Sequence, residues 1–256
     1  MYNNLSMLKS MKIFKPLLLT GSLLGFLLLF QSCLDDDDSD NTYWPSALVT
    51  VKSADNEAVY FQLDDKTTLL PVNLTKHPYD SKEVRALVNY KEVSDASGIY
   101  DRAVQVNWID SIRTKPMVPD LGDENDAEYG NDPVEIINDW VTIVEDGYLT
   151  LRFRTLWGGY GDKIHYINLL ESPDPEKPYE VELRHDASGD VHGRMGDALI
   201  AFKLDKLPDT EGETVKLKLK WNSFSGEKSV EFNYNSHASS PAGSDMASKR
   251  SEINVK

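Results

Sequence analysis

Apolar and polar residues alternate along most of the chain, in short segments. Within residues 103–109, for example, Val104, Val106 and Trp108 fall on one face and polar residues fall on the other. This period of two is typical of β-strands with one buried face, and no segment shows a convincing helical period. The pattern predicts strands at 47–52, 58–63, 68–70, 84–90, 103–109, 140–144, 148–153, 163–170, 179–184, 198–204, 215–221 and 229–234.

The strands fall into two groups, so the predicted fold class is all-β with two domains. The first five strands lie within about 70 residues, which predicts a small OB-type β-barrel at residues 47–117. The stretch 115–133 has three prolines, many acids and no period, and we interpret residues 118–133 as an acidic linker. The later strands predict an antiparallel β-sandwich at residues 134–236, with a hairpin turn at Asp146-Gly147.

Residues 1–32 have the pattern of a signal peptide. Three lysines precede an apolar run at 17–30, and this run is too short to be a membrane-spanning helix. The run ends at Ser32-Cys33, which resembles a bacterial lipobox, so we expect cleavage before Cys33 and a covalent lipid on its thiol. As the only cysteine, Cys33 excludes an intramolecular disulfide; the alternative is an ordinary buried core residue.

The residues after Cys33 predict an extended tether and a signal that sets the location of the protein. Residues 33–46 are strongly acidic at first, and their like charges repel and extend the segment. The run Asp35, Asp36, Asp37, Asp38 looks like the surface-export signal of lipoproteins in some Gram-negative bacteria. We therefore expect a lipid-anchored protein of the outer membrane that faces the cell exterior. At the other end, residues 237–256 lack any strand pattern and predict a disordered tail.

The charge excludes some partners. The net charge is −15, and it becomes −18 once the three lysines of the leader are removed. Such a surface repels nucleic-acid phosphates, so we expect no nucleic-acid partner. It also repels anionic lipid, which leaves the lipid on Cys33 as the membrane contact.

Five patches are informative when they are taken together, namely residues 60–65, 147–153, 165–169, 181–187 and 216–221. In order and spacing they resemble the NigD-like family of bacterial lipoproteins, over nearly all of the chain after the leader. The resemblance implies an N-terminal OB-like domain and a C-terminal β-sandwich domain. It implies little chemistry, because the family carries no catalytic motif. The family takes its name from a bacteriocin operon in which one member is regarded as the immunity protein.

Metal binding is a weak hypothesis. His185, Asp186 and His192 lie close together in the sequence, and imidazole and carboxylate groups bind transition metals. Their spacing matches no metal motif, and the alternative is an exposed turn after a strand. The acids and amides of residues 120–132 suggest calcium, but their order does not fit an EF-hand. Apart from the covalent lipid we expect no cofactor.

Two surface features suggest binding. Trp157, Tyr160 and Tyr166 could form an aromatic platform for a glycan or a protein, or they could fill the sandwich core. A row of lysines on one strand could attract an acidic partner, or it could be a solvated face or a guarded sheet edge. The row consists of Lys216, Lys218 and Lys220.

The residues as a whole predict a non-catalytic, surface-exposed outer-membrane lipoprotein. No nucleophile elbow or phosphate-binding loop is present, so we do not expect an enzyme. The leading hypothesis, from the resemblance, is bacteriocin immunity or another protective binding role. The alternative is a glycan-binding or adhesion accessory lipoprotein of an outer-membrane complex. The ligand, a protein or a glycan, stays open.

Overall fold

The computed structural model describes residues 44–54, 58–64, 66–158 and 163–236, all of which belong to one compact unit. The predicted signal peptide, Cys33, Asp35 to Asp38 and the tail lie outside the described residues. Within those residues no helix has the length and apolar character needed to cross a membrane.

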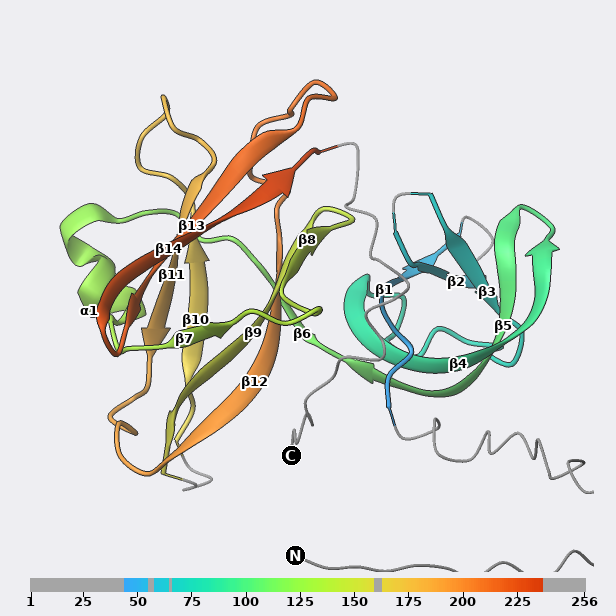
Figure 1. The fold of residues 1–256 in the computed structure, drawn as a ribbon, viewed down its shortest axis with the longest axis horizontal. Helices are drawn as coiled ribbons and strands as arrows, with labels where there is room; N and C mark the ends of the chain where they lie inside the picture. Colours follow the sequence, from blue (N-terminus) through green and yellow to red (C-terminus); the bar gives the residue numbers. More distant parts are fainter. Residues whose placement is uncertain (1–43, 55–57, 65, 159–162, 237–256) are drawn as a thin grey trace, which may run out of the picture. The chain divides into compact units, whose positions relative to one another are not determined.

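The first domain is a closed five-stranded barrel, as the sequence predicts (Figure 1). Its strands pair in the order β1-β2-β3-β5-β4, with β3 and β5 parallel. The apolar residue of each alternating pair points inward, and these side chains form a buried core. The strands are β1 (Ala47–Ser53), β2 (Val59–Gln62), β3 (Thr68–Pro71), β4 (Val84–Ser97) and β5 (Tyr100–Ser111).

Strands β4 and β5 are longer than the sequence predicts, because they form one continuous hairpin. Ser97 pairs with Tyr100, which leaves Gly98 and Ile99 as a two-residue turn. Gly98 has φ +67°, a left-handed conformation that glycine adopts without strain. The register shifts at Asn89/Tyr90 and at Glu92/Ser94, where β-bulges bend the hairpin and interrupt the simple alternation.

The second domain consists of two packed sheets around the larger core. One sheet has the order β10-β11-β13-β14, with the strands β10 (Tyr166–Leu170), β11 (Glu180–Asp186), β13 (Val215–Ser223) and β14 (Gly226–Tyr234). The other has the order β6-β12-β9-β7, and β8 pairs with β9 beside it. Its strands are β6 (Arg113–Pro116), β7 (Glu135–Ile137), β8 (Ile143–Glu145), β9 (Tyr148–Trp157) and β12 (Arg194–Lys203). The pairs β11–β13 and β6–β12 are parallel, so the sandwich is mixed.

The predicted hairpin at Asp146-Gly147 is confirmed. Glu145 pairs with Tyr148, and Asp146 and Gly147 have φ of 48° and 75°, the conformation that an Asp-Gly turn favours. The segment before it differs from the prediction, because β8 begins only at Ile143. Residues 139–142 form a turn closed by a hydrogen bond from the Thr142 amide to the Asp139 carbonyl, 3.0 Å. The apolar character of this turn reflects packing against the barrel.

The residues predicted to be an acidic linker are folded. They contain a 3-10 turn, η1 (Gly122–Glu124), and a short helix, α1 (Asn125–Tyr129). The Val118 amide donates to the Leu169 carbonyl at 2.9 Å, and the Glu171 amide donates to the Val118 carbonyl at 2.9 Å. This part of the chain therefore covers the edge of β10 and belongs to the sandwich.

The barrel and the sandwich share an apolar cluster. Leu48, Leu87 and Ile112 of the barrel pack with Val141 and Ala201 of the sandwich, and all five are buried. Leu48 and Leu87 lie on the outer face of the barrel, so the alternation that predicts a solvated outer face is broken where the second domain covers it. The contact between the barrel and the sandwich is therefore buried like the core of each domain.

A buried ion pair lies within this contact. Arg85 of β4 is 0% exposed, and its guanidinium donates to Glu145 Oε2 at 2.7 Å. It also donates to the hydroxyls of Thr50 at 2.9 Å and Thr150 at 3.4 Å, and it lies over the ring of Tyr148. The guanidinium of Arg85 therefore binds groups from both domains. Glu145 Oε1 has no hydrogen-bond partner among the described residues, so the carboxylate is only partly satisfied.

Removing one partner of this pair should be much more harmful than removing both. We expect R85M to lower the free energy of unfolding by about 3–5 kcal/mol at pH 8, because Glu145 must then be buried either as an unpaired charge or with a proton that it does not carry at this pH in the unfolded state. The double variant R85M/E145M should recover most of this loss. Urea unfolding measures both. R102M is the matched control, because Arg102 pairs with Glu92 on the barrel surface and should cost about 1 kcal/mol or less. Equal losses in R85M and the double variant would contradict this role.

The same pair should make stability depend on pH. Burial raises the pKa of Glu145 from 4.5 to about 7, although Arg85 acts in the opposite direction. The folded state therefore binds the proton more tightly than the unfolded state. This contribution to stability is complete below about pH 4.5 and is lost as the pH rises through about 7, in total about 3 kcal/mol.

We expect E145Q to lack this decrease when its free energy of unfolding is compared with that of the natural chain between pH 5 and pH 8. E135Q is the control, because Glu135 pairs with Lys228 at the surface. A natural chain and an E145Q variant with parallel pH profiles would show that Glu145 titrates normally.

Candidate functional site

Four side chains meet at one end of the sandwich core. Trp157 ends β9, His165 directly precedes β10, His185 lies in β11 and Asp190 lies in the turn after it. Trp157 has the same parity along β9 as the core residues Leu149, Leu151 and Phe153. His185 pairs directly with the core residue Ile167, and His165 lies two residues before Ile167. His165 and His185 therefore lie at the end of the space between the sheets, and Trp157 covers His165 from the exposed end of β9.

The polar atoms of this group form a chain of hydrogen bonds. His165 Nδ1 lies 2.9 Å from His185 Nε2, and His165 Nε2 lies 3.3 Å from Asp190 Oδ2. The other oxygen of Asp190 accepts the Gly158 amide at 2.9 Å. The Trp157 ring stacks on the His165 ring, with centroids 5.6 Å apart. We call these residues, Trp157, His165, His185 and Asp190, the histidine chain.

The two histidines and Asp190 are largely excluded from water, whereas Trp157 of the histidine chain is 40% exposed. His185 is 1% exposed, and Asp190 is also buried. Burial lowers the pKa of His185, the neighbouring His165 lowers it further, and Asp132 opposes both effects. His185 Nδ1 has no hydrogen-bond partner among the described residues, an arrangement that is uncommon for a buried ring nitrogen.

The structure separates the residues that the sequence suggested for a metal. Asp186 Oδ1 accepts the Ser188 amide at 2.7 Å, and Ser188 and Gly189 both have positive φ, so this part is a turn. His192 is exposed. The described residues contain no group of three or more metal-ligating side chains. Sequence reasoning missed His165, although its parity with Ile167 and Leu169 places it on the core face.

The aromatic residues suggested as a platform do not share a face. Trp157 faces the core, whereas Tyr166 points to the outer side of its sheet, because its neighbour Ile167 is buried. Tyr160 lies outside the described residues. Trp157 and Tyr166 therefore do not form one flat surface for a glycan.

The acids of residues 120–132 are bound within the protein. Asp120 accepts the Gly122 amide at 2.8 Å and the Asn125 side chain at 3.0 Å. Asp126 forms an ion pair with Arg184, and Asp132 accepts the Ala187 amide at 2.8 Å. These contacts hold the short helix and its neighbours on the sandwich, and the described acids do not converge on a common point.

The lysine row lies on an inner strand, so its interpretation as a guarded sheet edge is wrong. Strand β13 lies between β11 and β14. Lys218 and Lys220 both form ion pairs with Glu180 on β11, and Lys216 donates to Asn233 Oδ1 at 2.7 Å. The shallow hollow beside them, about 280 Å³, is lined by both signs of charge. The row is a solvated face with cross-strand pairs.

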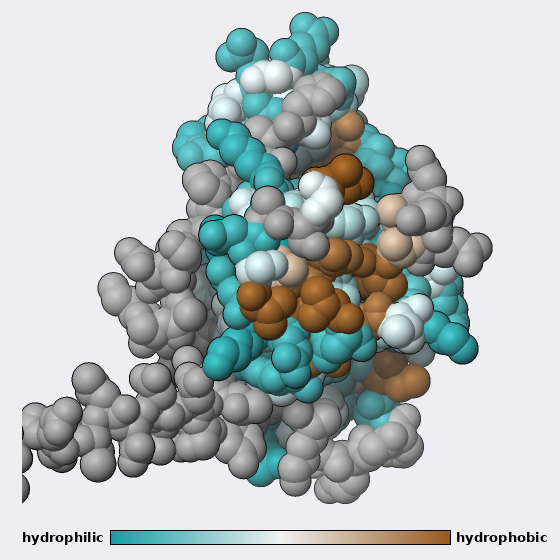
Figure 2. Space-filling view, turned by 90° about the vertical axis from the view of Figure 1, so that its right-hand side faces the viewer, coloured by the Kyte–Doolittle hydropathy of each residue, from teal (hydrophilic) through white to brown (hydrophobic). Residues whose placement is uncertain are grey.

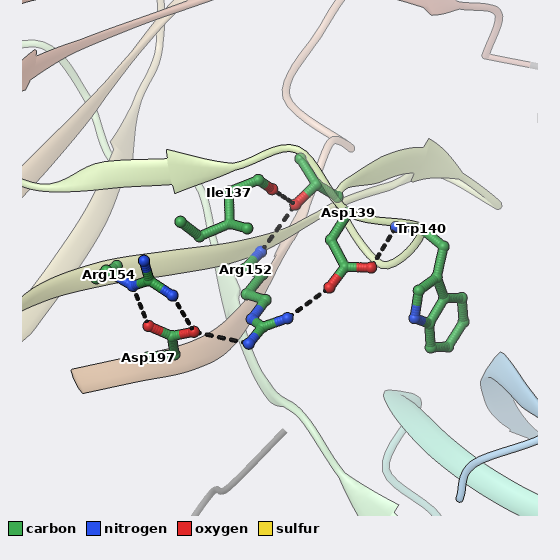
Figure 3. A network of polar contacts seen from close by, with 7 residues as sticks. Ile137, Asp139, Trp140, Arg152, Arg154 and Asp197 are labelled. Atoms are coloured by element: carbon green, nitrogen blue, oxygen red, sulfur yellow. Dashed lines mark hydrogen bonds and ion pairs between the residues drawn. The ribbon is translucent and has the colours of Figure 1, made fainter. Parts of the chain in front are cut away.

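A second polar network lies on the outer face of the other sheet. Figure 3 shows the Arg152 guanidinium between two carboxylates, with 2.6 Å to Asp139 Oδ2 and 2.7 Å to Asp197 Oδ2. Arg154 also binds Asp197, and this contact lowers the pKa of Asp197. Asp139 in turn accepts the Trp140 amide at 2.6 Å. The network fixes the turn that carries Trp140 and Val141 into the contact with the barrel.

Comparisons with known proteins agree with the fold. The family model described as the NigD-like N-terminal OB domain matches residues 48–112, and that of the NigD-like C-terminal β-sandwich domain matches residues 116–234. No curated protein matches the chain.

Several solved structures are similar to this chain. A toxin-related protein from Parabacteroides distasonis ATCC 8503 is 39% identical with a TM-score of 0.65, covering 74% of this chain and 92% of that one. A Bacteroides vulgatus ATCC 8482 protein of unknown function is 23% identical with a TM-score of 0.61, covering 73% and 89%. A NigD-like immunity protein from Bacteroides caccae ATCC 43185 is 22% identical with a TM-score of 0.53, covering 74% and 96%. The last two show the fold alone.

Proposed function

The chain belongs to the NigD-like family, and from this we propose that it is a non-catalytic, lipid-anchored protein of the outer-membrane surface that protects the cell by binding a protein toxin. The binding surface is the exposed side of the barrel. The observation that carries the proposal is an apolar patch on that side, surrounded by hydrophilic residues, which Figure 2 shows.

The barrel exposes three large aliphatic side chains, Val72, Val93 and Ile99, with exposed fractions of 53%, 49% and 88%. The Val72 amide donates to the Val104 carbonyl of β5, and Val93 is the bulge residue of β4 opposite the same part of β5. Val72 and Val93 therefore flank one strand. Ile99 lies in the hairpin turn, where polar residues and glycine are usual. We call these three exposed side chains, which are spread along β5 and the hairpin turn before it, the barrel patch.

The barrel patch fits a protein better than a sugar or a nucleic acid. Exposed apolar patches with polar rims mark protein interaction sites, and a projecting aliphatic side chain can fill a pocket in a partner. The rim includes the Glu92–Arg102 ion pair and the exposed Asp95 and Asp101. With a net charge of −15, the chain attracts cationic partners.

The start of the chain supports the location. A lipid on Cys33 would be 11 residues from Trp44, the first described residue, and an extended segment of this length spans roughly 40 Å at most. A tether of this reach lets the barrel meet a toxin close to the membrane. The relative that is 39% identical is a toxin-related protein by its own description, which supports the connection with toxins.

The location can be tested by protease shaving of intact cells. We expect the natural protein to be cleaved and a variant with Asp35 to Asp38 replaced by alanine to be protected, because the acid run is the export signal. Cleavage of both proteins in lysed cells is the control. Protection of the natural protein on intact cells would place it on the periplasmic side and exclude toxin capture outside the cell.

The binding role can be tested by complementation. A deletion strain should become more sensitive to toxins from neighbouring strains, and the natural gene should restore resistance. We expect V93S/I99S to fail, because losing two aliphatic contacts weakens an interface by about tenfold or more. I164S is the matched control, since Ile164 is an exposed isoleucine of the sandwich.

Surface amounts and thermal unfolding must be equal in the three strains that carry a gene. An unchanged sensitivity of the deletion strain would refute the protective role, and full resistance with V93S/I99S would refute the barrel patch as its surface.

A further inference from the structure

We propose that the histidine chain is a proton-controlled clasp, which holds this end of the sandwich closed around Trp157 and opens when both His165 and His185 are protonated. The clasp lies on the sandwich, so it is independent of the barrel patch and of the function proposed for it.

The geometry of the two rings carries the inference. Their planes are 17° apart, their centroids are 5.1 Å apart, and the facing nitrogens are 2.9 Å apart. The rings therefore lie edge to edge, with one nitrogen donating directly to the other. Such a bond needs one N–H and one free lone pair. Two fully protonated rings would place N–H against N–H and two positive charges within contact distance.

The hydrogen-bond partners determine which ring nitrogens of His165 and His185 carry a proton. Asp190 accepts from His165 Nε2, so in the neutral chain His165 Nδ1 is the acceptor and His185 Nε2 the donor. This leaves the lone pair of His185 Nδ1 buried without a donor, while the backbone of Asp132 and Pro133 favours the protonated form of this ring. The first added proton therefore binds His185 Nδ1 and keeps every hydrogen bond. The second must bind His165 Nδ1, and that breaks the bond between the rings.

The surrounding charges set the pH range. Two carboxylates lie beside the histidine chain, Asp190 on the turn and Asp132 on the segment before β7, whereas Asp186 lies on the opposite face of β11. One ammonium, that of Lys163, binds the Ser188 carbonyl at 3.2 Å. The carboxylates favour protonation, whereas the burial of His185 opposes it and lowers its pKa below 6.5. The second proton must join a pair of rings that is already positive, so opening follows at a lower pH than the first protonation.

The clasp connects segments that are far apart in the sequence. Asp190 holds the Gly158 amide after β9, and the His185 carbonyl accepts the Asp132 amide at 2.8 Å. A side chain at Gly130 would collide with the His185 carbonyl, because its Cβ would lie only 2.6 Å from that oxygen. The ring of Trp157 rests on His165. Movement of His165 would therefore release Trp157 and the Gly158 amide together.

The test uses the whole mature chain with Cys33 replaced by serine. Hydrogen exchange of the Gly158 amide, corrected for its intrinsic rate, should accelerate at least about tenfold between pH 7.5 and pH 5. The Trp157 emission, taken as the natural chain minus W157F, should change over the same range. Both transitions should be absent in H165Q and in H185Q. They should persist in H192Q, an exposed histidine of the same turn, and in E145Q, which removes the titrating group between the domains.

Measurements on the natural chain test the proposal even if a histidine variant does not fold. Flat Gly158 exchange and flat Trp157 emission between pH 7.5 and pH 5 would overturn the proposal. So would a transition that H192Q removes as completely as H185Q does, because the proton would then act elsewhere.

Discussion

The buried charge of Arg85 is the constraint on which the arrangement of the two domains depends. A guanidinium that is 0% exposed needs acceptors on every side, and among the described residues of the barrel only the Thr50 hydroxyl accepts from it. The sandwich supplies Glu145 and Thr150. Apolar contact alone would tolerate sliding, whereas an ion pair with fixed directions does not. The shared cluster and the Arg152 network fit around this point, since they place Trp140 and Val141 where the barrel packs.

Because the contact between the two domains is fixed, different surfaces stay exposed on each domain. One outer face of the barrel is used for packing, so its other side is left to expose the barrel patch. The inner faces of the two sheets of the sandwich pack on each other, and the histidine chain lies at one end of this core. The proposed binding surface and the proposed pH response thus lie in separate parts of the chain.

Most of the charges that suggested chemistry in the sequence are used within the protein. The acids before β7 bind backbone amides and Arg184, and the lysines of β13 bind Glu180 and Asn233. Each satisfied group removes a candidate ligand site. The buried groups that stay partly unsatisfied carry more information, and His185 and Glu145 are the clearest of these.

The sequence by itself predicted most of the strands, the apolar face of those strands and the Asp-Gly hairpin, because these depend on local periodicity and turn chemistry, but it missed β6 and β7. The similarity of five patches predicted the order of the two domains. Only the tertiary structure decided that Arg85 meets Glu145, 60 residues later, and that His165 meets His185. It also decided that β13 is an inner strand and that residues 139–142 form a turn. These features depend on strand order and on contact between domains, and short-range alternation contains no information on either.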